Sequence, residues 1–134
     1  MADAYVQVTT TIDERSDAAD LARSAVEERL AACAQVLGPV SSTYWWEGEV
    51  EIAEEWMVLF KTTADRFEEL AIHINDRHSY DTPEIIATPV VAGSAEYLGW
   101  ITEQTTDPDD DPDDDGDDSD DGRDLIDDDI EIVD

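Results

Sequence analysis

The sequence is poor in basic residues and contains a single lysine, Lys61. Only 7 of its 134 residues are lysine or arginine, against 37 aspartates and glutamates, which gives a formal net charge of −30. A chain without a basic stripe cannot neutralise the phosphates of a nucleic acid, and an anionic membrane surface repels it. We therefore expect neither nucleic acid nor membrane lipid as a partner.

Long apolar runs and a second cysteine are also missing. No stretch approaches the length of a transmembrane helix or of the apolar part of a signal peptide, which predicts a cytoplasmic protein. Because Cys33 is the only cysteine, no disulfide can form within the chain. Cys33 lies in an alanine-rich stretch that favours a helix, and we interpret it as a small core residue rather than a nucleophile.

The composition divides the chain after Thr106. Residues 107–134 contain 17 acidic residues and one arginine, a net charge of −16, whereas residues 1–106 carry a net charge of −14. The first part is typical of one globular domain, and the aspartate-rich part is expected to be largely disordered because it cannot bury a core. In molar salt the Debye length falls to about 3 Å and charge repulsion nearly vanishes. The domain surface therefore predicts adaptation to a salty cytoplasm, such as that of a halophilic archaeon, and an ordinary acidic protein is the alternative.

Hydrophobic periodicity in the first 106 residues predicts alternating strands and helices. The predicted strands are 4–11, 41–46, 52–63 and 85–92. The predicted helices are 17–32, one capped by Asp65 and one beginning after Ser94. Gly38-Pro39 interrupts an extended segment, Glu47-Gly48-Glu49 is typical of a hairpin turn, and Pro89 predicts an edge or bulged position.

This order of elements is that of the ferredoxin-like, or split βαβ, arrangement of the α+β class, followed by a C-terminal helix. It predicts one antiparallel sheet with helices on one face. The other face needs a cover, because Trp45 and Trp46 precede a strand that is apolar on both sides. We predict that further subunits provide this cover; the alternative is that the tryptophans fill the core of one chain.

Polar chemistry is concentrated between a predicted helix and a predicted strand, from His78 to Glu84. This segment holds a histidine, two carboxylates and a phenol, and Pro83 stiffens it. One interpretation is a binding site, and the other is a solvated turn that begins a strand. The remaining histidine, His73, is expected to be solvated rather than to bind a metal.

Four separated motifs and the last predicted helix resemble the CutA family, the divalent-cation-tolerance proteins. The motifs are Leu30-Ala31-Ala32-Cys33, Tyr44-Trp45-Trp46-Glu47-Gly48, Lys61-Thr62-Thr63 and the run from His78 to Ile85, and Tyr97-Leu98-Gly99-Trp100 fits the family's last helix. The resemblance covers about residues 5–104, and the motifs stand in the family's order.

The resemblance implies a homotrimer that forms by strand pairing between subunits, with a fold similar to that of the nitrogen-regulatory PII proteins. It implies binding of a divalent metal, copper especially, without catalysis. His78 and Glu84 match positions proposed as metal ligands at the cleft between subunits, and imidazole with carboxylate suits copper or zinc. Thr10 stands where the family often has a cysteine ligand, and a hydroxyl is a poor ligand for a soft metal. Hydrogen bonding at the subunit interface is the alternative role for His78 and Glu84.

Two other functions compete with metal binding. A PII-like signalling module would bind a small anion or nucleotide at the intersubunit cleft, but the sequence has no Gly-rich loop. The basic residues near plausible loops are Arg15, Lys61, Arg66 and Arg77. An enzyme would need a nucleophile beside a base, and with only two histidines we predict no catalytic residue.

The acidic segment carries two further patterns. Alternating aspartates from Asp111 resemble the start of a calcium loop, but Gly122 stands where the bidentate glutamate belongs. We therefore expect loose condensation of cations along the aspartates. Residues 130–133 alternate like a short strand that would pair with an exposed sheet edge of this or another protein, and a frayed end is the alternative.

Overall fold

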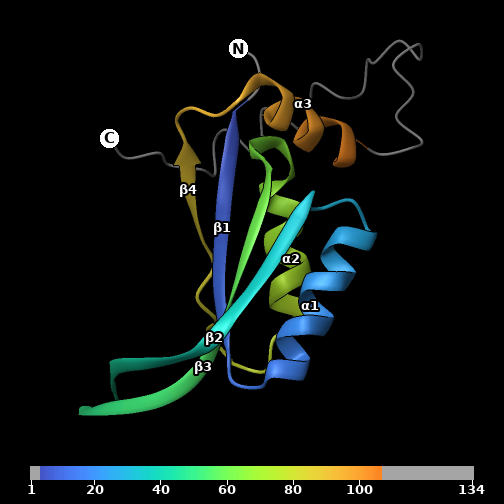
Figure 1. The fold of residues 1–134 in the computed structure, drawn as a ribbon. Helices are drawn as coiled ribbons and strands as arrows, with labels where there is room; N and C mark the ends of the chain where they lie inside the picture. Colours follow the sequence, from blue (N-terminus) through green and yellow to red (C-terminus); the bar gives the residue numbers. More distant parts are fainter. Residues whose placement is uncertain (1–3, 107–134) are drawn as a thin grey trace.

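The computed structural model describes residues 4–106 (Figure 1). Its elements in chain order are β1 (Tyr5–Ile12), α1 (Arg15–Glu27), β2 (Cys33–Trp46), β3 (Glu49–Thr63), a 3₁₀ turn (Ala64–Arg66), α2 (Phe67–Arg77), β4 (Ile86–Val90) and α3 (Ala95–Gln104). The strands form one sheet in the order β2-β3-β1-β4, and every neighbouring pair is antiparallel. The predicted split βαβ arrangement is confirmed.

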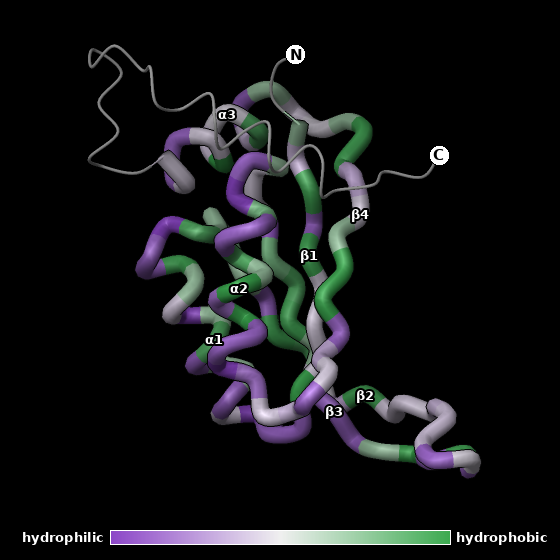
Figure 2. Tube along the Cα trace, turned by 180° about the vertical axis from the view of Figure 1, so that it is seen from behind, coloured by the Kyte–Doolittle hydropathy of each residue, from purple (hydrophilic) through white to green (hydrophobic). Residues whose placement is uncertain are grey.

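Helices α1 and α2 cover one face of the sheet and form the core with it. Figure 2 shows the two helices side by side in front of the strands. Successive residues of a strand point to opposite faces. On β3, Val58 and Phe60 are fully buried beneath the helices, while Met57 and Leu59 on the other face are half-buried. The prediction that β3 has apolar residues on both faces is thus confirmed. Leu70 and Ile74 of α2 are fully buried, as predicted for the inner face of this helix.

Helix α1 ends earlier than predicted, at Glu27 instead of residue 32. Arg29 adopts a positive φ of 65°, the conformation that glycine usually supplies after a helix. The N–H of Leu30 donates to the carbonyl of Ala25, and the N–H of Arg29 donates to that of Val26. These two bonds satisfy carbonyls that the end of the helix leaves free, and the chain turns back toward the sheet.

Strand β2 runs without interruption from Cys33 to Trp46, where we predicted an extended segment and a separate strand. The predicted break at Gly38-Pro39 is an irregularity in the pairing with β3, between Leu37 and Val40. Cys33 is the first residue of this strand and is half-buried. Its predicted place in a helix was wrong, because α1 had already ended.

Beyond the irregularity, β2 and β3 leave the sheet as a two-stranded ribbon, seen at the lower left of Figure 1. We call residues 40–55 the arm. Glu47 and Gly48 close it with positive φ values of 48° and 82°, which suit a two-residue hairpin turn. The predicted turn is confirmed. The large apolar side chains in its outer part are exposed in the single chain, and that of Trp45 is 74% exposed. They are Tyr44, Trp45, Trp46, Val50 and Ile52.

The C-terminal part of the described chain completes the other edge of the sheet. Within residues 4–106, strand β4 pairs only with β1, so Pro89 lies on an edge strand of the described sheet, as predicted. The side chain of Ser94 accepts a hydrogen bond from the first turn of α3 and caps it. The hydroxyls of Tyr5 and Thr102 lie 2.6 Å apart and tie α3 to β1.

Three further expectations from the sequence can be compared with the described residues. No helix within residues 4–106 is long and apolar enough to span a membrane. The aspartate-rich segment, with its calcium-like pattern and the predicted strand at 130–133, lies outside the described residues. Asp65, predicted to cap the second helix, lies in the 3₁₀ turn that precedes α2.

Candidate functional site

His78 ends α2 and begins the loop that leads to β4. Its Nε2 lies 2.8 Å from the carbonyl oxygen of Thr11, at the end of β1. The backbone N–H of Tyr80 donates to its Nδ1 at 3.1 Å. Because Nδ1 accepts, the ring proton is on Nε2 and is donated to Thr11. Both ring nitrogens are therefore engaged within the chain.

Tyr80 connects this loop to the arm. Its hydroxyl donates to Oε2 of Glu55 at 2.6 Å, and its ring centre lies 4.7 Å from that of His78. Glu55 is on β3 and is only 6% exposed. Burial and the bond to Glu55 raise the pKa of Tyr80 far above its ordinary value of 10. The phenol thus keeps its proton and remains a donor to the buried carboxylate.

The other two predicted site residues lie outside this network. Glu84 is exposed on the loop before β4. Thr10 is fully buried on the face of β1 that the helices cover, and its Oγ1 has no hydrogen-bond partner in the described chain. The structure thus brings His78 next to Thr11 rather than to the side chain of Thr10.

As arranged in one chain, these residues do not fit a copper or zinc ion. A metal-binding imidazole needs a free lone pair, but in His78 one nitrogen accepts from Tyr80 and the other carries the proton. Within residues 4–106, no group of three or more His, Cys, Asp or Glu side chains is placed to hold a metal. Thr10 offers only a hydroxyl, and it faces the core.

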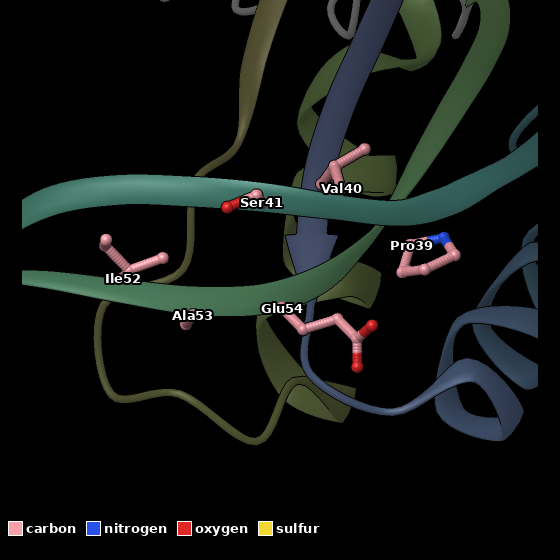
Figure 3. A pocket seen from close by; sticks show the side chains of 6 residues that line it. All are labelled: Pro39, Val40, Ser41, Ile52, Ala53 and Glu54. Atoms are coloured by element: carbon pink, nitrogen blue, oxygen red, sulfur yellow. The ribbon is translucent and has the colours of Figure 1, made fainter.

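A hollow of about 260 Å³ lies at the base of the arm, between β2 and β3 (Figure 3). Its lining residues are Pro39, Val40, Ser41, Ile52, Ala53 and Glu54. Glu54 is the only carboxylate among them, and the lining includes no histidine or cysteine. The hollow is therefore not a second candidate for a metal site; it is part of the surface that the arm presents.

His73 is buried, so its predicted solvation was wrong. It is only 5% exposed, with Nε2 2.7 Å from Oγ of Ser24 and Nδ1 3.7 Å from a carboxylate oxygen of Glu28. Burial, and to a lesser degree Arg77, lower its pKa below 6.5. Its spacing from Leu70 was the signal in the sequence that could have predicted this burial. Residues three positions apart lie on the same face of a helix, and Leu70 is fully buried.

Ser24, His73 and Glu28 include the residue types of a catalytic triad, but their geometry is that of a joint between two helices. Oγ of Ser24 also lies 3.1 Å from the carbonyl of Leu21 in its own helix, which accepts from it. The 3.7 Å between His73 and Glu28 exceeds a hydrogen-bond distance. We assign this cluster to the contact between α1 and α2.

The basic residues predicted near loops do not converge on one anion site. Each of the four has a partner of its own in the described chain. Arg15 lies over the ring of Trp56, Lys61 donates to Gln35, Arg66 contacts Glu69 and the carbonyl of Thr105, and Arg77 lies 3.8 Å from Glu28. A phosphate group would have to compete with these contacts one at a time.

The chain matches a family model described as CutA1 divalent ion tolerance protein over residues 6–104. The divalent-cation tolerance protein CutA of Thermus thermophilus is 40% identical over 98 residues, which are 73% of this chain and 95% of that protein. The chloroplastic protein CutA of Arabidopsis thaliana is 39% identical over 100 residues, which are 75% of this chain and 55% of that protein. The chain therefore spans little more than half the length of the chloroplastic relatives it matches.

The solved structures agree with the sequence match. The periplasmic divalent cation tolerance protein CutA from Archaeoglobus fulgidus superimposes with a TM-score of 0.74 at 35% identity, over 75% of this chain and 98% of that one. The family resemblance that the motifs predicted is thus confirmed by sequence and by fold. This chain belongs to the CutA family of divalent-cation-tolerance proteins.

Proposed function

We propose that this chain works as a homotrimeric divalent-cation-tolerance protein without enzymatic activity, and that the arm is the surface through which its subunits assemble. The observation that carries the proposal is the exposure of the arm. Trp45 is 74% and Ile52 is 70% exposed, and Trp46 and Val50 are exposed beside them. Soluble monomers rarely leave a contiguous apolar surface of this kind uncovered.

Two further features support assembly through the arm. A two-stranded ribbon is marginally stable by itself in water, and this one projects away from the helices that cover the rest of the sheet (Figure 1). The number of subunits comes from the family resemblance, which implies a trimer formed by strand pairing. Within the described residues, the arm has strand edges without a neighbouring strand, and it has exposed apolar side chains for such pairing.

A pair of matched variants tests the role of the arm. Ile52→Ser removes an exposed apolar side chain from the arm, and Ile72→Ser makes the same change on the outer face of α2, where Ile72 is 55% exposed. We expect association, measured by light scattering over a concentration series, to weaken about tenfold or more for Ile52→Ser. Ile72→Ser should associate like the wild type. Equal association of both variants would refute assembly through the arm.

We place the cation-binding role in the assembly rather than in one chain. Both ring nitrogens of His78 are engaged in hydrogen bonds within the chain, so the ring offers no free lone pair to a metal. A cleft between subunits can instead combine donors from two chains. The predicted weak site for copper or zinc at His78 and Glu84 remains a separate hypothesis. Calorimetric titration with Cu²⁺ and with Zn²⁺ should show a site in the wild type that Ile52→Ser loses. Loss of this heat in a His78→Ala variant that still associates like the wild type would favour the predicted ligands.

The alternative of a PII-like module that binds a nucleotide has no support in the described residues. The basic side chains near loops are dispersed and each has a partner of its own, and the family model that matches the chain is that of the CutA1 divalent ion tolerance proteins. A rise in melting temperature on addition of ATP would reopen this alternative.

Adaptation to high salt is a further part of the proposal. Three copies of a domain with a net charge of −14 repel one another, and salt screens this repulsion. Association should therefore strengthen as KCl is raised from about 0.1 M to about 1 M. A cytoplasmic location stays a prediction, because the relatives include proteins named chloroplastic and periplasmic.

A further inference from the structure

The arm leaves the sheet at a point where two neighbouring residues of β3 are held from opposite faces. On the helix-covered side, the ring of Trp56 packs so closely on Gly38 that a Cβ added there would lie 2.5 Å from a ring carbon. The guanidinium of Arg15 lies 5.7 Å from the centre of the same ring. Trp56 therefore fixes the irregular part of β2 against the sheet.

On the other side, Glu55 is held by the loop after α2. Its partner in β2 is Val40, the first residue paired beyond the irregularity. The Glu55 carboxylate accepts from the hydroxyl of Tyr80, the N–H of Tyr80 donates to His78, and His78 donates to the end of β1 at Thr11. Three hydrogen bonds thus connect the start of the arm to a central strand.

We propose that His78, Tyr80 and Glu55 form a brace that fixes the direction of the arm, and that His78 is a positioning residue for assembly rather than a ligand for copper or zinc. The part that concerns assembly rests on the proposed function. The part that concerns the ring of His78 does not.

The hydrogen bonds of His78 distinguish the two roles. Donation from Nε2 to a carbonyl would also suit a metal ligand, since metal-binding histidines usually donate their other N–H in this way. The N–H of Tyr80 decides the matter, because it occupies the lone pair of Nδ1 that the metal would need. The same N–H belongs to the residue whose hydroxyl holds the buried Glu55, so the contact serves the brace.

A fixed arm also makes physical sense for a chain that assembles. Ordering a flexible segment at the moment of binding costs affinity, and a segment that is already held in its bound direction avoids that cost. A buried carboxylate such as Glu55 is retained only where it is hydrogen-bonded. The brace uses that requirement to connect the loop to the arm.

Association in a chelating buffer is the first test, with the full chain in about 1 M KCl and EDTA. Tyr80→Phe removes only the oxygen that holds Glu55, and His78→Asn removes the ring; each should weaken association about five- to tenfold. Glu84→Gln, which changes the other predicted ligand, is the control and should associate like the wild type. If His78→Asn and Tyr80→Phe both associate like the wild type without metal, the brace is refuted.

Nitrogen NMR of the histidine rings is the second test, and it does not depend on assembly. The spectrum should show the proton of the His78 ring on Nε2 rather than on Nδ1, and Zn²⁺ should leave the Nδ1 signal of His78 in place. A Zn²⁺-dependent shift of that signal would overturn the assignment of His78 as a positioning residue. If the wild type proves to be a monomer, the proposed function fails, but this spectrum still decides the role of His78.

Discussion

Strands β2 and β3 pass through two environments that differ in what covers them. Near the helices, Val58 and Phe60 of β3 are fully buried, whereas Val50 and Ile52 of the same strand are exposed in the arm. The two strands are paired antiparallel in both regions, on either side of the irregularity between Leu37 and Val40. The difference is that α1 and α2 extend over one region only (Figure 1). The covered region is buried within residues 4–106 alone, while the arm has an apolar surface that these described residues leave open.

This comparison separates two kinds of stability. Substitutions in the covered region should act on the folding of one subunit, and substitutions in the arm should act on association. Since unfolding and association can be measured independently, variants in the two regions test whether the two kinds of stability are separate.

The largest effect is expected in the covered region. Phe60→Ala removes a large, fully buried side chain and should lower the free energy of unfolding by about 3–5 kcal/mol. Chemical denaturation at high salt, monitored by circular dichroism, measures the loss. A loss below about 1 kcal/mol would mean that the core beneath the helices is not what stabilises the subunit.

Trp45→Ser should show the opposite behaviour. Trp45 lies near the tip of the arm, so the free energy of unfolding of a separated subunit should change by no more than about 0.5 kcal/mol. Association should weaken by about 2 kcal/mol, because large aromatic side chains dominate interfaces. Sedimentation velocity over a dilution series measures this change. Unchanged association would place Trp45 outside the interface.

Two buried threonines sharpen the account of the covered region. Thr10→Val replaces a buried hydroxyl that has no partner within residues 4–106 by a methyl group and should stabilise the subunit by about 1 kcal/mol. Thr62→Val is the matched control, because Thr62 is also fully buried but donates to the carbonyl of Leu30 at 2.8 Å. That variant should destabilise by about 1 kcal/mol or more. A gain or loss of the same sign in both would show that their partners do not differ as described.

The smallest effect is a pH dependence in the helical layer. Burial holds the pKa of His73 below 6.5, so the unfolded chain binds the proton first as the pH falls. The contribution of neutral His73 is complete above pH 6.5 and is lost as the pH falls through the lowered pKa. The melting temperature should therefore fall more steeply between pH 8 and pH 5 for the wild type than for His73→Gln. Parallel curves would contradict this, since the carboxylates titrate in both proteins.

Local sequence patterns predicted the elements that depend on neighbouring residues. The turn at Glu47-Gly48, the edge position of Pro89 and the inward residues of α2 follow from backbone conformation and spacing. The end of α1 was missed because Arg29 takes the conformation that normally marks a glycine, so the sequence carries no stop signal there.

The candidate site depended on contacts that spacing does not reveal. His78 was identified from its loop and the family motif, but Glu55 was not, because its bond to Tyr80 joins residues 25 positions apart on different elements. Only the register of β3 and the path of the loop bring them together. The one available hint was that Glu55 stands next to the apolar run of β3. A glutamate at such a position is more often exposed to solvent than buried, so the hint did not identify it.

The most direct test of the central claim is the mass of the full chain by sedimentation equilibrium in about 1 M KCl. If further copies cover the arm, the mass should be three times the 14.9 kDa of one chain, and it should fall toward one chain on dilution. A single 14.9 kDa species at every concentration would contradict the account, because the exposed tryptophans of the arm would then face water without a partner.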